Sequence, residues 1–485
     1  MRLRTRELPV FPVAAGPVRP GVDPGVQAVD PRSFDIGPKD GPRLGLVTLG
    51  CDKNTVDSEH MMAALVAAGA RVTGDVEKAD VVVVNTCGFI DAAKEQSIDT
   101  ILNACELKAR GRVRAVAAVG CMVQRYREEL EREIPEVDLF LGIAEMSRLV
   151  PELRARGHIR DDIVHNMERP LRILATETRH VSFLKISEGC DHRCAFCAIP
   201  HMRGLHRSAD LESLVAEARA LGEQGVRELN LVSQDTTWYG RDRWRRDRSA
   251  PLLEDLLEAL LDGTGVDWYR LLYMYPSGIT PALVSLLARE PRLLPYLDMP
   301  LQHGSDRVLA RMRRPERRRT VRERVRWLRA EIEDLTLRTT VIVGFPGETE
   351  EDVQAMLDFL AEIRFDRLGA FAYSIEEGTP AAAMPDQVPD EVKAERLDRV
   401  MELQRGISWR SNRDWVGRRA QVMVDGPAPE ETGHDAVGRT GGQAPEVDGR
   451  TFLTGFGSAS VRAGDIVEVE IVDADDYDLT GRPIA

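Results

Sequence analysis

The sequence contains no long apolar run. A helix that spans a bilayer needs about 20 consecutive apolar residues, and no stretch of the 485 residues approaches that length. The first forty residues are rich in proline and lack a continuous apolar segment, so they do not have the composition of a secretion signal. We therefore expect no membrane partner, and we expect residues 1–41 to form a disordered leader.

Cysteine is also scarce, and the 79 aspartates and glutamates outnumber the 65 lysines and arginines. Seven cysteines in a chain without an export signal predict reduced thiols and a cytoplasmic location, rather than disulfides. The formal net charge of −14 argues against a general nucleic-acid binder, because proteins that bind phosphate backbones are normally basic. The few cysteines are therefore best explained as ligands.

Three cysteines lie on one short segment with the spacing C-x3-C-x2-C, as Cys190, Cys194 and Cys197. A cubane iron–sulfur cluster normally takes one thiolate per iron, so three thiolates leave one iron with an open position. The spacing resembles that of the radical S-adenosylmethionine (SAM) enzymes, in which the open iron binds SAM. The alternative is a structural zinc site with His192 as fourth ligand, although zinc ligands usually come from two separated pairs.

Three further cysteines each follow a predicted strand. Valine-rich runs alternate with helical patterns in this region, which is typical of a doubly wound parallel sheet. The runs are Leu44–Leu49, Asp80–Asn85 and Val113–Val119, and the cysteines after them are Cys51, Cys87 and Cys121. Because the carboxyl ends of parallel strands share one edge, we expect these thiols to converge. The alternative is unrelated core cysteines, which is our interpretation of Cys105 in its helical stretch.

The central region, from about Val181 to Arg405, contains about six strand–helix units. This pattern predicts an open, partial (β/α) barrel with its chemistry at the carboxyl ends of the strands. Three strand-end segments carry groups suited to SAM, and the candidate pocket residues are Ser233, Gln234, Asp235, Gln302, Gly344, Pro346 and Gly347. The arginine-rich run 311–329 is compatible with an RNA-binding stripe, but we favour the commoner alternative of a solvated helix face.

The last part of the chain predicts a small antiparallel β-barrel, because short strand candidates alternate with glycine and proline turns. The candidates are Gln421–Val424, Ala436–Arg439, Thr451–Leu453 and Ile466–Val472. From Asn412 to Ala485 there are seven arginines, no lysine, and fourteen aspartates and glutamates, a formal charge of −7. RNA affinity depends largely on lysine and arginine. We therefore expect this barrel to bind a basic protein; the alternative is an acidic surface that only confers solubility.

Taken together, the cysteine motifs and domain order resemble the methylthiotransferase family of radical SAM enzymes, from Leu44 to Ile484. The resemblance implies an auxiliary-cluster domain over residues 42–165, a radical SAM core over 176–410 and a TRAM-like barrel over 412–485. Within the family, the chain is most similar to the branch that modifies small-subunit ribosomal protein twelve. The segments that carry this similarity are Leu49–Asn54, Val56–Glu59, Cys190–Cys194, Ile199–Pro200, Pro300–His303, Ala444–Gly449 and Asp473–Leu479.

The resemblance implies two [4Fe-4S] clusters and SAM as cofactors. Cys51, Cys87 and Cys121 would hold an auxiliary cluster that carries the sulfur to be inserted, and the C-x3-C-x2-C segment would hold the SAM-cleaving cluster. One SAM would methylate that sulfur. A second would yield a 5′-deoxyadenosyl radical that removes hydrogen from the β-carbon of a target aspartate. No catalytic residue beyond the cluster ligands is predicted.

The implied partners are the basic ribosomal protein, an electron-donor protein and a sulfur donor, with no required nucleic-acid contact. Two other functions remain open. Methylthiolation of a transfer RNA adenosine would be favoured by a basic terminal barrel, whereas this barrel is acidic. A non-catalytic iron–sulfur carrier would bind clusters without cleaving SAM, and it would leave the strand-end motifs of the central region without a purpose.

Overall fold

The computed structural model describes residues 35–160, 172–174, 178–457 and 461–484. Most of the predicted leader, residues 1–34, lies outside the described residues. The chain divides into two compact units: the first comprises the residues up to Glu177 together with Ile199–Gly204, and the second comprises all others. Among the described residues, no helix combines the length and apolarity that crossing a membrane requires.

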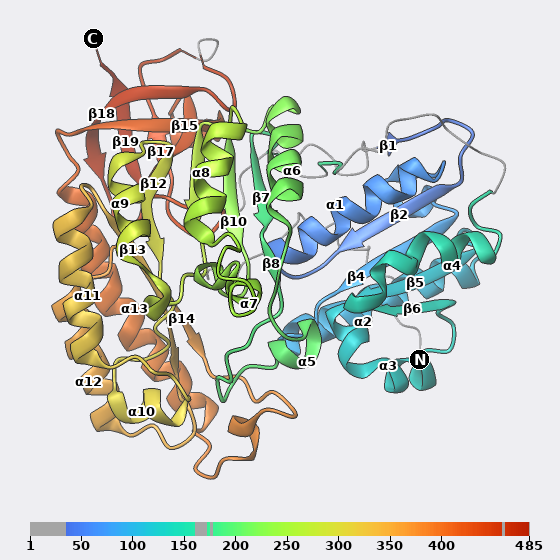
Figure 1. Cartoon of the computed structure of the whole chain (residues 1–485), viewed down its shortest axis with the longest axis horizontal. Coiled ribbons are helices and arrows are strands. Elements are labelled where there is room, and N and C mark those ends of the chain that lie inside the picture. The colour runs from blue at the N-terminus through green and yellow to red at the C-terminus, as the bar shows by residue number, and fades with distance from the viewer. Residues whose placement is uncertain (1–34, 161–171, 175–177, 458–460, 485) are drawn as a thin grey trace. The chain divides into compact units, whose positions relative to one another are not determined.

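The first unit is a mostly parallel sheet with helices on both faces (Figure 1). Its strands are β1 (Asp35–Ile36), β2 (Arg43–Thr48), β3 (Arg71–Thr73), β4 (Val81–Thr86), β5 (Ala115–Gly120) and β6 (Leu139–Gly142), in the order β1-β3-β2-β4-β5-β6. Its helices are α1 (Asp52–Ala67), α2 (Asp91–Ala109), α3 (Cys121–Glu133), α4 (Leu149–Ala155) and the five-residue α5 (Ile199–Arg203). The predicted doubly wound sheet is confirmed. The short strands β1 and β3 were not predicted, because two or three residues show no detectable alternation.

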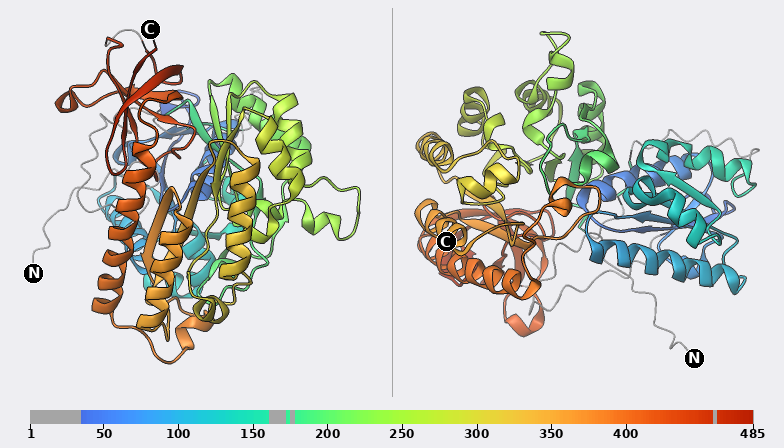
Figure 2. Two further views of the ribbon diagram at one scale, coloured as in Figure 1. Left: turned by 90° about the vertical axis from the view of Figure 1, so that its left-hand side faces the viewer. Right: turned by 90° about the horizontal axis from the view of Figure 1, so that it is seen from below.

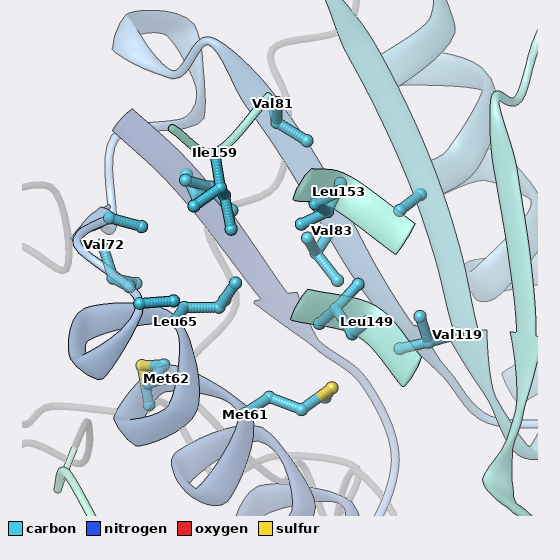
Figure 3. Close-up of a cluster of buried hydrophobic side chains, with 14 of the residues drawn as sticks. Met61, Met62, Leu65, Val72, Val81, Val83, Val119, Leu149, Leu153 and Ile159 are labelled. Carbon is cyan, nitrogen blue, oxygen red and sulfur yellow. The ribbon is translucent and has the colours of Figure 1, made fainter. Parts of the chain in front are cut away.

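Two apolar clusters hold this unit together, one on each face of the sheet. Figure 3 shows Leu65 of α1 and Leu149 and Leu153 of α4 facing the strand residues Val81 and Val83. The opposite face packs against α2 and α3. Both β4 and β5 are buried along their whole length, which explains their continuous apolar sequence, since a strand covered on both faces has no polar side.

The second unit contains an open, six-stranded parallel sheet in the order β14-β13-β12-β11-β10-β7. Its strands are β7 (Val181–Lys185), β10 (Glu228–Val232), β11 (Trp268–Leu271), β12 (Leu293–Asp298), β13 (Thr336–Val343) and β14 (Arg367–Ala372). The helices are α6 (Leu211–Glu223), α7 (Arg241–Trp244), α8 (Leu253–Gly263), α9 (Pro281–Arg289), α10 (Asp306–Arg311), α11 (Arg318–Glu331), α12 (Glu350–Ile363) and α13 (Asp390–Arg413). The short strand β8 (Ser187–Glu188), which follows β7 in sequence, forms an antiparallel pair with β9 (Arg207–Ser208). The predicted partial barrel is confirmed.

The end of the chain forms the closed barrel β15-β16-β17-β19-β18, which α13 joins to the sheet (Figure 2). Its strands are β15 (Arg419–Pro427), β16 (Ala436–Thr440), β17 (Thr451–Leu453), β18 (Ile466–Ala474) and β19 (Leu479–Pro483). The barrel was predicted, but β19 was not, because glycine and proline are poor strand formers. The pairing is antiparallel except for β17 with β19, which run parallel.

The barrel packs against the amino ends of the core strands. Glu228, the first residue of β10, accepts hydrogen bonds from Arg270 Nε at 2.9 Å and from Arg439 Nη1 of the barrel at 2.7 Å. Arg439 also donates to both carboxylate oxygens of Asp425 at 2.9 Å, and Asp425 in turn lies 3.0 Å from His180 Nε2. Burial opposes the charge on Glu228, but Arg439 and Arg270 outweigh it and hold the pKa of this carboxyl below its usual value.

We predict that Glu228→Gln destabilises the second unit by on the order of 3 kcal/mol, because it leaves two buried guanidinium groups without their shared carboxylate. The expected result is a lower midpoint of chemical unfolding at pH 7, measured by circular dichroism. The exposed Glu258, paired with Arg289, provides a control: Glu258→Gln should change stability by less than about 1 kcal/mol.

The same pair of variants has a defined pH dependence. Because folding lowers the pKa of Glu228, its stabilising contribution is complete above the ordinary glutamate value of 4.5 and is lost as the pH falls below it. The difference between the native chain and Glu228→Gln should therefore shrink below pH 4.5. A difference that is constant from pH 7 to pH 3 would contradict an ionised Glu228.

Candidate iron–sulfur sites

The first unit brings three cysteines to one edge of its sheet. Strands β2, β4 and β5 are neighbours and parallel. Cys51 is the N-cap of α1 after β2, Cys87 follows β4 directly, and Cys121 is the first residue of α3 after β5. Two of the thiols thus lie at the N-terminus of a helix of 13 or 16 residues, where the helix dipole favours a thiolate.

Asn54 organises this edge. Its side-chain amide donates to the carbonyl oxygens of Leu49 at 2.7 Å and Thr86 at 3.1 Å, so it joins the ends of β2 and β4. Its Oδ1 atom lies 3.8 Å from Cys121 Sγ. The same oxygen accepts a hydrogen bond from Arg203 Nη2 at 2.6 Å, and Arg203 also contacts Asp57 at 3.2 Å. A buried positive charge therefore lies beside the thiols.

The electrostatics of this edge suit a metal cluster. Burial raises the pKa of Cys121 to about 12, while Arg203 acts in the opposite direction and the nearby Cys51 and Cys87 add to the increase. Protonated thiols are not metal ligands, so a bound cation must supply the remaining stabilisation of the thiolates. Three thiols and one fixed guanidinium thus fit an iron–sulfur cluster, and three thiols leave one iron of a cubane open.

The space around the thiols depends on a glycine. Gly50 has φ +96°, and a Cβ atom placed on it would lie 2.9 Å from Cys87 Sγ. Any side chain here would push the Cys87 thiol away from its position and would also strain the backbone.

We predict that Gly50→Ala removes more than half of the iron held at Cys51, Cys87 and Cys121. The experiment uses a full-length chain with Cys190, Cys194 and Cys197 changed to alanine, so that iron and acid-labile sulfide report this site alone, with about four irons per chain expected. Gly111→Ala is the matched control, because Gly111 has φ +74° and a Cβ atom placed on it would have no neighbour within 4 Å. Equal iron loss in both variants would show that backbone strain, not the Cys87 contact, is responsible.

The second unit positions the C-x3-C-x2-C segment after β8. Gly189, with φ +77°, turns the chain immediately before Cys190. The backbone of Ala195 donates to Met312 O and accepts from Ala381 N, both at 2.9 Å. Phe196 packs against a buried apolar cluster that includes Phe345. Burial raises the pKa of Cys190 to about 12, and a backbone hydrogen bond from His192 acts against this increase.

His192 has partners that the sequence did not indicate. Its Nε2 atom lies 2.6 Å from Asp235 Oδ2, and its ring stacks on Tyr275 with centroids 3.9 Å apart. This nitrogen is therefore engaged by a carboxylate. Among the described residues, no three His, Cys, Asp or Glu side chains converge as the ligands of a single ion do. A cubane does not require such convergence, since each thiolate binds a different iron.

The predicted SAM-pocket residues all lie at the carboxyl ends of strands in this sheet: Ser233, Gln234 and Asp235 after β10, Gln302 after β12, and Gly344, Pro346 and Gly347 after β13. Both polar atoms of the Gln234 side chain are buried without a hydrogen-bond partner, as expected of a group that awaits a ligand. Asp235 differs, because its carboxylate already accepts from Thr237 and contacts His192. Ser233 Oγ accepts from the Asp235 amide.

The remaining pocket candidates have unusual backbone conformations. Gln302 has φ +78° and exchanges backbone hydrogen bonds with β13, donating to Thr340 O at 2.8 Å and accepting from Ile342 N at 2.7 Å. Such strain in a non-glycine residue costs about 1–3 kcal/mol and is common at functional sites. Gly344 and Gly347 have positive φ, and added Cβ atoms would meet Lys393 and Arg311. The positive φ favours glycine at both positions, and contact with SAM stays a prediction.

Sequence reasoning missed the side chains that surround the thiols. Asn54, Tyr275 and Arg314 contact the cysteines or their loop. Arg203 acts on Cys121 through its charge. Both Asn54 and Arg203 are close in sequence to cysteines, and Asn54 ends one of the segments that carry the family resemblance, but neither residue was given a role. Tyr275 and Arg314 lie far from the cysteines in sequence, and Arg314 was included in the predicted solvated face.

The open parallel sheet of the second unit and its C-x3-C-x2-C segment are typical of the radical SAM class of enzymes. Comparison with family models agrees: residues 43–142 match "Uncharacterized protein family UPF0004", residues 184–360 match the radical SAM superfamily, and residues 416–484 match the TRAM domain. Among solved structures, the radical S-adenosylmethionine methyltransferase TsrM from Kitasatospora setae is 15% identical with a TM-score of 0.49, covering 70% of this chain and 77% of that one.

Curated relatives identify the branch. The ribosomal protein uS12 methylthiotransferase RimO of Anaeromyxobacter sp. (strain K) is 48% identical, covering 91% of this chain and 93% of the relative. The RimO proteins of Symbiobacterium thermophilum and Geobacter sulfurreducens are 47% and 45% identical, covering 91% of this chain and 90% and 99% of theirs. The chain belongs to the RimO family of radical SAM methylthiotransferases. The predicted family and reaction class are thus confirmed.

Proposed function

We propose that this enzyme inserts a methylthio group at the β-carbon of an aspartate of ribosomal protein uS12, in the cytoplasm. It would use two [4Fe-4S] clusters, an auxiliary one at Cys51, Cys87 and Cys121 and a SAM-binding one at Cys190, Cys194 and Cys197. The observation that carries this proposal is that each parallel sheet presents its own set of three cysteines at or beside its carboxyl edge. The uS12 substrate follows from the names of the relatives.

The two clusters together would supply a sulfur source and the single electron that cleaves SAM. The residues of the chain bind, orient and shield these groups. Arg203 and Asn54 fix the charge and position of the auxiliary thiols. The stacked His192 and Tyr275 rings hold the C-x3-C-x2-C loop. Gln234 offers a buried amide to the amino, carboxylate or ribose groups of SAM, and exclusion of water around these groups protects a reactive intermediate.

The acidic terminal barrel supports a basic protein as substrate. Its exposed carboxylates are Glu430, Glu431, Glu446, Asp465, Glu468, Asp473 and Asp475. The exposed barrel arginines are partly neutralised, since Arg482 pairs with Glu470 and Arg418 pairs with Asp334. A surface of this charge repels RNA phosphates and attracts lysine- and arginine-rich protein. An electron-donor protein and a sulfur donor complete the proposed set of partners.

We predict that Cys194→Ala and Cys87→Ala separate the two halves of the reaction. Cys194→Ala should reduce formation of deoxyadenosine to background, because the SAM-binding cluster loses a ligand. Cys87→Ala should still cleave SAM on addition of a strong reductant, but should form no methylthio product. Mass spectrometry of the nucleoside and peptide products measures both. Methylthio product from Cys87→Ala would contradict the proposed division of roles.

We predict that the substrate is protein. The reconstituted enzyme, with SAM, sulfide and a strong reductant under anaerobic conditions, is offered either a peptide from the target loop of ribosomal protein uS12 or unmodified transfer RNA. A methylthio mass gain is expected on the peptide aspartate, with none on the RNA. A gain on the RNA alone would keep the reaction class and overturn the substrate, whereas deoxyadenosine without either product would overturn both substrates.

Binding of whole ribosomal protein uS12 to the same reconstituted enzyme tests whether the acidic barrel attracts the substrate. Binding should weaken with added salt, and the double change Glu430→Lys with Glu431→Lys should weaken it further at low salt. Reversal of two exposed acids on α13, Glu391→Lys with Asp398→Lys, controls for net charge. Equal weakening in both double variants would assign the effect to overall charge and not to the barrel.

A further inference from the structure

One arginine of the arginine-rich run differs from its neighbours. Arg313 and Arg319 are exposed, as expected for a solvated face, but Arg314 is only 5% exposed. It lies in the connection between α10 and α11, next to the C-x3-C-x2-C loop. A buried guanidinium needs partners that offset its desolvation.

Arg314 contacts Cys194, one of the proposed cluster ligands. Its Nη1 donates toward Cys194 Sγ at 3.8 Å, its Nη2 donates to Pro300 O at 2.8 Å, and its Nε lies 3.0 Å from Glu316 Oε2. Its Cζ lies 3.9 Å from the centroid of the Tyr275 ring, a cation–π contact that also fixes the plane of the guanidinium. These contacts therefore define both the position and the orientation of the Arg314 guanidinium.

Arg314 is the first member of a stacked column. Tyr275 lies between the guanidinium and the His192 ring, with ring centroids 3.9 Å apart and planes 12° apart. The outer His192 nitrogen contacts Asp235, which is itself held by Thr237. Because His192 belongs to the cysteine loop, the column links the loop to the ends of β10 and β11, while Arg314 contacts the loop directly at Cys194.

We propose that Arg314 is a positioning residue that raises the reduction potential of the cluster held by Cys190, Cys194 and Cys197. This inference rests on the cluster assignment in the proposed function. Reduction adds negative charge to the cluster, and a buried cation that donates to a ligand sulfur stabilises the reduced form; hydrogen bonds to sulfur and local charge are known determinants of such potentials. Glu316, 5% exposed and beside Arg314, acts in the opposite direction.

The test uses full-length chain in which Cys51, Cys87 and Cys121 are alanine, so that one cluster remains. Its midpoint potential is measured by redox titration monitored by electron paramagnetic resonance. Arg314→Met should lower the ratio of reduced to oxidised cluster at least about tenfold at the wild-type midpoint, a shift of about 59 mV for one electron. Arg314→Lys retains the charge, so its midpoint potential should lie between that of the parent chain and that of Arg314→Met.

Shifts of the midpoint potential in opposite directions would distinguish an electrostatic effect of Arg314 on the cluster from simple structural support. Glu316→Gln removes a negative charge and should raise the potential, while Arg319→Met removes an exposed arginine and should leave it unchanged. If Arg314→Met fails to bind a cluster, Arg314→Lys and Glu316→Gln decide the question. Unchanged potentials in those two variants would overturn the inference. Absence of a cluster from the parent chain, in which Cys190, Cys194 and Cys197 are intact, would instead overturn the proposed function and the inference with it.

Discussion

Parallel strand pairing is the constraint on which both sites depend. When neighbouring strands run in the same direction, residues that follow each of them meet at one edge, however far apart they lie in the chain. Cys51, Cys87 and Cys121 span 71 residues of sequence but follow three adjacent strands. The second sheet applies the same rule to the segments after β10, β12 and β13. The cysteines of the first unit lie on ordinary strand–helix connections, whereas the C-x3-C-x2-C segment lies in the longer connection between β7 and α6, which also contains β8, α5 and β9.

Sequence reasoning was most successful where periodicity and spacing are local. The alternation of valine-rich runs with helical patterns located β2, β4 and β5, and the cysteine spacing indicated cluster chemistry. It was least successful for contacts between distant segments. Tyr275 and Arg314 meet only because strand and helix packing brings the end of β11 to the α10–α11 connection, and composition alone placed Arg314 in a solvated run. Gly344 and Gly347 show the reverse case, since their positive φ, together with the packing of Gly344 against Lys393, accounts for glycine without a ligand.

Buried arginine recurs in both units, each time next to thiols or a carboxylate. Arg203 lies beside the thiols of the first unit, Arg314 beside Cys194, and Arg270 with Arg439 around Glu228. Arginine suits these positions because its fork of donors can satisfy several acceptors while its charge stays fixed at any accessible pH. These four guanidinium groups, each buried, thus offset the thiols and carboxylates beside them.

The Glu228 network also bears on how such chains can evolve. A terminal barrel that met the core only through an apolar surface could be exchanged between related enzymes with little adjustment. Here the core contributes Glu228 and Arg270, and the barrel contributes Arg439 and the Gly441 carbonyl that Arg270 contacts at 2.7 Å. A foreign barrel would have to supply the matching cation at the same position, or leave a carboxylate uncompensated. Recombination that swaps only the barrel is therefore disfavoured, and the two parts are expected to be inherited together.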